Sequence, residues 1–230
     1  APIGLYLQAD RMADLGHARA DLLAHAPGIW IAPADGREIG HGALMAAMAK
    51  RQVVLLGETH DRADVHRWQL HVAAGILAHR RDVAMGFEMF PRRVQPVLDR
   101  WAMGELTEAK FLEEVEWKEV WGFPPELYLP LFRFCREFRL PMLALNCRRA
   151  LVTDVGKLGW DAIPDSDRDG LTPAKPATEA YRKRLVRRGS DPMDQANDRF
   201  VRAQQTWDRA FACNIAKALD GPNPQLVIGI

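Results

Sequence analysis

Hydrophobic residues along this 230-residue chain form short continuous runs that alternate with longer segments of helical periodicity. Continuous apolar runs bounded by turn residues are typical of buried parallel strands. We expect five strands, in the ranges 28–32, 53–57, 83–88, 141–145 and 225–229. Their alternation with helices predicts an α/β fold, with a mainly parallel central sheet flanked by helices and with helical insertions.

Apolar residues three and four positions apart predict the helices between these strands. In 64–80, for example, Val65, Trp68 and Val72 share one face. The other expected helices span 11–25, 43–50, 95–103, 107–117, 126–139 and 194–219. Thr107 is the expected N-cap of its helix.

One polar, proline-rich stretch interrupts this alternation, at residues 156–193. We expect a mobile insertion or lid there. The length allows one larger domain or two small ones. We expect a single α/β domain over residues 1–230, with 28–155 and 194–230 as its core.

Composition excludes several functional classes. The net charge is +1 with 27% charged residues, so no strong field recruits nucleic acid. No stretch reaches the roughly 20 apolar residues of a membrane span. The three cysteines, Cys135, Cys147 and Cys213, lack the spacing of a metal site such as CxxC.

Polar residues follow three of the predicted strands, where functional sites of parallel sheets lie. Glu58, His60 and Asp61 come after the 53–57 strand, in the string Gly-Glu-Thr-His-Asp. Glu88 ends the next strand, and Asn146 ends the third. One rim then carries two carboxylates, an imidazole and an amide, which can bind a metal, activate water or seat a polar ligand. The simpler interpretation is a strand-to-helix turn in which Asp61 or Thr59 caps the next helix.

Further motifs follow in order along the chain. They are His66 and Gln69, expected to point towards the rim; Phe-Glu-Met-Phe at 87–90; Trp117 and Trp121 before Tyr128; Leu-Ala-Leu-Asn at 143–146; and Phe200-Val201 with Trp207-Asp208. Together they resemble the ChaN-like family over roughly residues 28–230. These proteins are iron-regulated, haem-binding bacterial lipoproteins grouped with the Tiki and TraB proteins and, more remotely, with the erythromycin esterases.

The resemblance implies a haem- or iron-binding protein of bacterial iron acquisition, located in the cell envelope as a periplasmic or outer-membrane lipoprotein. Any membrane contact would be made through a lipid anchor absent from this chain. The protein could also form a homodimer. In the superfamily's metal-dependent hydrolases, a GxxH pair works with glutamates. Gly57 to His60 and Glu88 match the first GxxH and its glutamate. The second GxxH follows the last strand, so we expect a histidine beyond Ile230.

Two functions therefore stand side by side. The first is haem binding near the carboxyl rim, with the axial ligand left open. Its expected ligand-binding residues are Asp61, His66, Gln69, Asn146, Trp117, Trp121 and Tyr128, with further surface from Phe123 and the Met89–Phe90 turn. The alternative is a metal-dependent hydrolase in which Glu58, His60 and Glu88 hold a divalent ion or act as catalytic groups.

Overall fold

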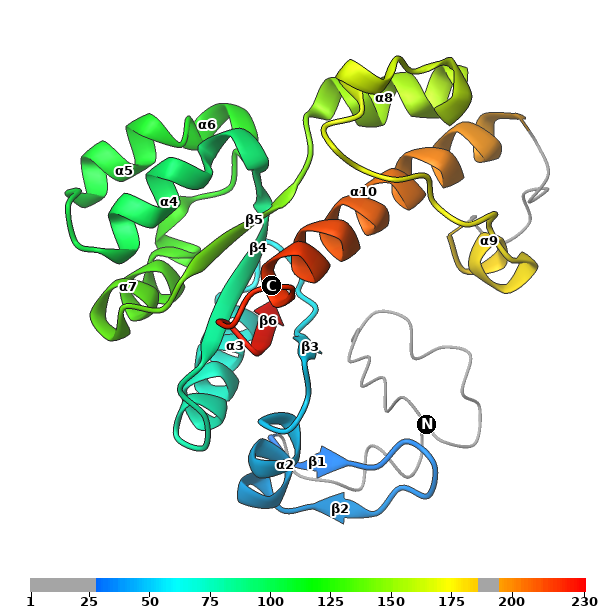
Figure 1. Cartoon of the computed structure of the whole chain (residues 1–230). Coiled ribbons are helices and arrows are strands. Elements are labelled where there is room, and N and C mark those ends of the chain that lie inside the picture. The colour runs from blue at the N-terminus through cyan, green and yellow to red at the C-terminus, as the bar shows by residue number, and fades with distance from the viewer. Residues whose placement is uncertain (1–27, 186–194) are drawn as a thin grey trace.

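A four-stranded parallel sheet organises the protein, which a computed structural model describes over residues 28–185 and 195–230. Its strand order is β3-β6-β4-β5 (Figure 1). The strands are β3 (Val53–Leu55), β4 (Val83–Pro91), β5 (Met142–Asn146) and β6 (Leu226–Gly229). Every pairing in this sheet is parallel, which confirms the predicted fold class and four of the five predicted strands.

Strand β6 lies inside the sheet, between β3 and β4. Its residues Leu226, Val227 and Ile228 are all buried, as expected for an apolar run paired on both sides. Alternate side chains enter opposite layers: Leu226 and Ile228 join the larger core, whereas Val227 packs with Leu145 and Ile215.

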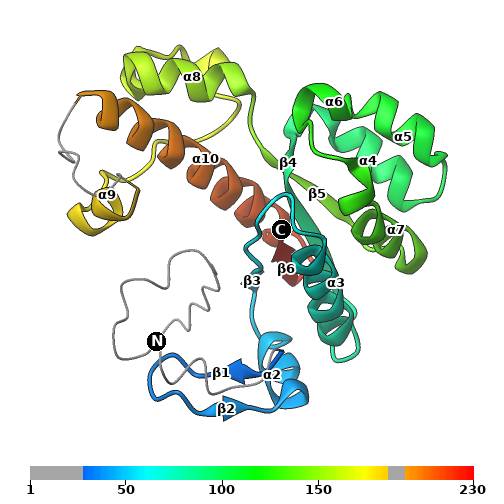
Figure 2. The same ribbon diagram turned by 180° about the vertical axis from the view of Figure 1, so that it is seen from behind.

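Helices cover both faces of the sheet. On one side lie α3 (Ala63–Leu77), α4 (Gln95–Ala102), α5 (Glu108–Glu114), α6 (Trp117–Val120) and α7 (Leu129–Phe138). On the other lies the long α10 (Gln195–Leu219), which crosses β5 and β6 and packs against α8 (Arg149–Leu158) (Figures 1 and 2). Thr107 caps α5 as predicted: its side chain accepts a hydrogen bond from Lys110 N.

The expected 28–32 strand does not belong to the central sheet. Its ordered part, β1 (Trp30–Ile31), pairs antiparallel with β2 (Glu38–Ile39) in a separate two-stranded sheet. A turn that includes Asp35 and Gly36 joins the two strands, and Ala32 N donates to Arg37 O across it. This short hairpin precedes α2 (His41–Met48), which packs on α3.

The prediction that 53–57 is a fully buried strand is also wrong. Strand β3 is an edge strand, and Val53 and Leu55 are 37% and 63% exposed. Val54 points to the opposite face and is buried in the larger core. The apolar run thus marks a strand correctly but does not tell an edge position from a central one.

Further short helical pieces lie around this core. They are the short turns Arg92–Val94, Pro125–Leu127, Trp160–Ala162 and Asp165–Asp167, and the helix α9 (Glu179–Leu185). Ile163 and Leu171 are buried with α8 and α10 side chains in a second hydrophobic cluster. The predicted lid remains a prediction. The helix expected at 11–25 lies outside the described residues, and no helix in the described segments is long and apolar enough to cross a membrane.

Candidate functional site

The site lies where β3 and β4 reach the same edge of the sheet. Glu58 and His60 occupy the loop between β3 and α3, and Glu88 lies within β4. Pairing between β4 and β5 is regular up to Phe87 and resumes at Pro91, so Glu88 falls at an irregularity of the ladder. Such irregularities re-aim side chains, and they are frequent beside functional sites.

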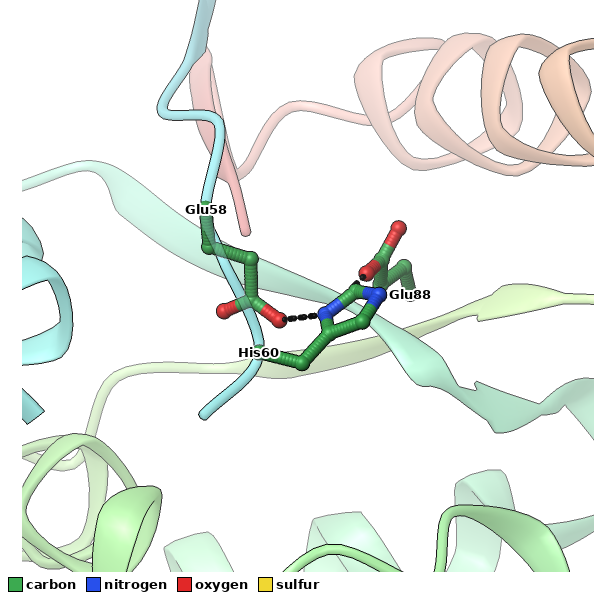
Figure 3. Close-up of side chains that lie close together, drawn as sticks. All are labelled: Glu58, His60 and Glu88. Carbon is green, nitrogen blue, oxygen red and sulfur yellow. Dashed lines mark hydrogen bonds and ion pairs between the residues drawn. The ribbon is translucent and has the colours of Figure 1, made fainter. Parts of the chain in front are cut away.

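Three side chains converge at this edge (Figure 3). His60 Nδ1 lies 2.5 Å from Glu58 Oε1 and 3.6 Å from Glu88 Oε1. One potential ligand atom from each residue lies within 4.8 Å of the other two. The proximity expected from the strand ends is therefore confirmed.

Glu58 is held in place by two further residues. Its side chain is only 4% exposed, and Tyr128 Oη donates to Oε1 over 2.9 Å. Oε2 accepts no hydrogen bond from the described residues, although His66 Nδ1 lies 3.2 Å away at ion-pair distance. Both carboxylate oxygens thus face donors, which fixes the rotamer of the side chain.

The two carboxyl groups of the site have opposite electrostatic surroundings. Burial alone would raise the pKa of Glu58, but its contacts with His60, His66 and Tyr128 outweigh burial and lower that pKa to about 2. Burial, followed by repulsion from the Glu58 carboxylate, raises the pKa of Glu88 to about 7. At neutral pH one carboxyl group is fully ionised and the other exchanges a proton, a division typical of functional sites.

Both histidines are biased towards their charged forms. The hydrogen bond with Glu58 raises the pKa of His60. Burial opposes the charged form of His66, but contacts with Glu58, the His60 carbonyl and Gln69 still raise its pKa. Burial and the neighbouring Glu58 raise the pKa of Tyr128, so this hydroxyl keeps its proton and acts as a donor.

Two aromatic rings, Trp121 and Phe123, form what we call the aromatic wall of the site. The Trp121 ring meets His60 edge-on at 4.8 Å between centroids, and Phe123 lies 5.2 Å from His60. Trp117 is buried behind the wall and donates from Nε1 to Phe123 O over 2.7 Å. The His60 side chain remains 42% exposed, so one side of its ring is open to a ligand.

A cavity of about 950 Å³ adjoins this wall. It is lined by Leu112, Glu113, Glu116, Trp117, Lys118, Glu119, Gly122, Phe123, Pro124 and Pro125. Its size is at the upper end for small-molecule pockets. Two of its glutamates already pair with cations, Glu113 with Lys110 and Glu116 with Arg93. Sequence reasoning missed this cavity, and only the rigid Gly-Phe-Pro-Pro break at 122–125 hinted at it.

The remaining predicted site residues are distributed unevenly. Asn146 approaches the site, but its Nδ2 donates to Glu88 O over 2.7 Å and its Oδ1 accepts from Cys147 N, so it braces the backbone. Asp61 is exposed and takes part in none of the contacts described above. Met89 and Phe90, expected in a turn, lie in β4 and cannot supply a ligand surface, because both side chains are buried in the larger core at 1% and 0% exposure.

The three converging side chains fit a divalent cation. Imidazole nitrogen and carboxylate oxygen are ligands for zinc, iron and manganese. Donors about 2.0–2.2 Å from one ion lie at most about 4.4 Å apart, so a shift of less than about 1 Å would bring this set into range.

Comparisons with known proteins identify the family and the fold of the chain. The family profile described as haem-binding uptake, Tiki superfamily, ChaN matches residues 44–230. A solved structure, reported as cofacial heme binding to ChaN of Campylobacter jejuni, superimposes with a TM-score of 0.67 at 17% sequence identity. The similarity covers 88% of this chain and 78% of that one. No curated protein sequence matches the chain.

Proposed function

The chain belongs to the haem-binding uptake family of ChaN in the Tiki superfamily, and we propose that it binds haem at the carboxyl rim of its sheet in bacterial iron acquisition. The observation that carries this placement is the aromatic wall beside the half-exposed His60 ring. A porphyrin is a large flat apolar body, and aromatic side chains supply the matching contact area.

Two polar groups near the wall suit the remaining parts of haem. His60 Nδ1 is engaged by Glu58, whereas Nε2 takes part in no hydrogen bond that the described residues make. A neutral imidazole nitrogen is a common ligand of haem iron, and a carboxylate on the other nitrogen orients the ring. Lys118 lines the adjoining cavity and offers a cation to a propionate. Bound haem would supply the iron, while these residues bind and orient it.

Haemin binding should depend on the aromatic wall. Replacing Phe123 by alanine removes one of its two rings, and we expect the dissociation constant for haemin to rise by about 10-fold or more, because roughly 1.5–3 kcal/mol of apolar burial is lost. Phe200, 46% exposed on α10, provides the matched control, since Phe200→Ala leaves the wall intact. Titration followed at the Soret band measures both.

The result also separates placement from function. If Phe123→Ala and His60→Ala both bind haemin with the affinity and spectrum of the wild-type protein, haem does not bind at this rim. If the wild-type protein itself shows no saturable haemin binding, the proposed function is wrong.

A second candidate function, a metal-dependent hydrolase, is favoured by the convergence of Glu58, His60 and Glu88. A divalent ion held by His60 and the carboxylates would polarise a substrate and lower the pKa of bound water. If His60 and Glu58 hold the ion, Glu88 is the spare carboxylate, and its pKa, raised to about 7 in the ligand-free site, suits it to accept a proton near neutral pH.

Replacing His60 and Glu88 together by alanine should abolish this metal binding without unfolding the protein. We expect the Zn²⁺ or Mn²⁺ dissociation constant to rise by about 100-fold or more, since two of three donors are lost. The free energy of unfolding should change by only about 1 kcal/mol, because both side chains are partly exposed. Calorimetric titration and urea unfolding measure the two quantities. Glu113→Ala combined with His71→Ala is the control pair, and unchanged affinity in the site variant would exclude the trio as a metal centre.

We also propose that the protein works in the cell envelope as an anchored lipoprotein and that it can pair as a homodimer. The resemblance of its motif series to exported ChaN-like proteins supports this location. Cell fractionation with the complete gene, together with light scattering with and without haemin, tests both points. Recovery of the complete protein only from the cytoplasm would contradict the first point, and a monomer under both conditions would contradict the second.

A further inference from the structure

A chain of buried polar groups lies behind the candidate ligands. It starts at Gln69, which is 0% exposed, and continues to His66, which is 3% exposed. Both residues lie in the first half of α3, the helix that follows the site loop. Burial of uncharged polar groups is unfavourable unless they are hydrogen-bonded, so this arrangement needs a reason.

The orientation of the Gln69 amide determines which atoms face each other in this series of buried polar groups. Its Nε2 donates to the Leu56 carbonyl over 2.9 Å, so its Oε1 is the atom that faces His66 Nδ1, at 3.2 Å. The other ring nitrogen of His66, Nε2, lies 3.2 Å from the His60 carbonyl. All the neighbours of this ring's nitrogens are acceptors: the Gln69 amide oxygen, the Glu58 carboxylate and the His60 carbonyl.

These contacts hold the site loop at three successive points. Gln69 binds the backbone at Leu56, and His66 contacts the Glu58 carboxylate and the His60 carbonyl. Tyr128, whose ring centroid lies 4.4 Å from that of His66, contacts the same two groups through Oη, at 2.9 Å and 3.3 Å. Side chains of α3 and of the residue at the start of α7 therefore hold residues 56–60, and we call this set of contacts the clamp.

Neither His66 nor Gln69 can touch a ligand of the site, because both are buried beneath the loop. We propose that they are positioning residues, which hold Glu58 and the His60 backbone so that the His60 ring and Glu88 meet a bound ion or haem iron with little rearrangement. This inference rests on the proposed binding site. Such outer contacts typically change ligand affinity by about 10- to 100-fold when they are removed.

Gln69→Met tests the clamp, because methionine fills a similar volume but makes neither hydrogen bond. We expect the Zn²⁺ dissociation constant to rise by about 10- to 100-fold and the visible spectrum of the Co²⁺-loaded site to change. Gln69→Glu keeps an acceptor for His66 and should lose less affinity. His71→Ala, an exposed change on the same helix, is the control and should match the wild-type protein.

Two readouts separate positioning from general stability. A merely structural role would lower the melting temperature of Gln69→Met but leave the Zn²⁺ affinity and the Co²⁺ spectrum of the folded protein unchanged, and that result would overturn the proposal. In a His60→Ala background, Gln69→Met should cost little further affinity, because the group that it positions is gone. If the losses of Zn²⁺ affinity caused by His60→Ala and Gln69→Met were fully additive, that result would also contradict the positioning role.

The His60 ring resonances in NMR spectra of the ligand-free protein provide a test that needs no ligand. One sharp set is expected in the wild-type protein, and broadened or multiple sets in Gln69→Met and Gln69→Glu. Unchanged His60 resonances in both folded variants would refute the clamp. Failure of the wild-type protein to bind Zn²⁺ and haemin would instead refute the proposed function, so the two failures are distinguishable.

Discussion

Replacing Phe132 by alanine is expected to lower the free energy of unfolding by about 3–5 kcal/mol, the usual cost of deleting a buried phenyl ring. The ring is 0% exposed. Its centroid lies 5.2 Å from that of Phe87, 5.4 Å from Phe90, 5.5 Å from Phe111 and 5.7 Å from Trp117. These four neighbouring rings come from three elements, β4, α5 and α6, so a cavity here cannot be closed by moving one of them.

The same helix contains the matched control. Phe138 is 57% exposed near the end of α7, and Phe138→Ala should change the free energy of unfolding by no more than about 0.5 kcal/mol. Urea unfolding measures both variants, with an unchanged dependence on denaturant indicating that the unfolded state is the same. Equal losses for Phe132→Ala and Phe138→Ala would show that this aromatic cluster is not the stabilising core.

The core and the site share an element, which links stability to function. Tyr128 caps α7 and stacks on Phe132 at 6.3 Å between ring centroids, and its hydroxyl donates to Glu58. The rigid aromatic cluster thus holds a donor of the site in place. A scaffold of this kind reduces the rearrangement that ligand binding requires.

The strand-end rule allowed the site to be predicted from sequence. Glu58 and His60 share one loop and Glu88 lies 28 positions after His60, yet parallel strands deliver all three to one edge. The rule needs only the positions of apolar runs, which are the clearest pattern in this sequence. It gives the rim but not the contacts, because side-chain directions there depend on the loop and on packing from other elements.

The sequence-based predictions were wrong where the position of a strand depends on which other strands lie beside it. The 28–32 run pairs with Glu38–Ile39 instead of joining the main sheet, although the turn around Asp35 and Gly36 was visible and antiparallel hairpins need only a short connection. Likewise, Leu55 is exposed because β3 lies at the edge of the sheet. Strand order is a tertiary property that periodicity does not encode.

The buried clamp shows a third kind of limit. His66 and Gln69 were expected to reach the ligand, since their helical positions face the rim. Their position on the face was right, but both are buried, because the loop 56–60 lies over them. The sequence gives no direct signal for whether a polar side chain touches a ligand or supports the residue that does.

The protonation of Glu88 should make the free energy of unfolding depend strongly on pH. Glu88 has a folded-state pKa of about 7 against 4.5 for an unperturbed carboxyl group, because burial and the Glu58 carboxylate disfavour its charge. The folded state therefore binds the proton more tightly than the unfolded state. Its contribution to stability is fully present below pH 4.5 and is lost as the pH rises through 7.

The carboxyl groups and histidines of the site act in different pH windows. The lowered pKa of Glu58, about 2, contributes stability that is present above pH 4.5 and lost only as the pH falls towards 2. The raised pKa values of His60 and His66 contribute stability below pH 6.5 that is lost at higher pH. Comparing the free energies of unfolding of the wild-type protein and a Glu88 variant at each pH separates the contribution of Glu88 from these others.

We therefore expect Glu88→Gln to stabilise the ligand-free protein relative to wild type by an amount that grows between pH 4.5 and 7 and then levels off. A shift from 4.5 to about 7 corresponds to at most about 3 kcal/mol. The Glu88 side chain is 27% exposed, and solvent screening reduces this to about 1–3 kcal/mol. Urea unfolding from pH 5 to 8 with a chelator present measures the difference.

If the two stability curves run parallel, Glu88 is already ionised in the fold at pH 5 and cannot be the group that exchanges a proton near neutrality. If the curves diverge as expected, ionisation of Glu88 beside His60 destabilises the folded protein above neutral pH. A cation bound to the ionised carboxylate would then offset this destabilisation.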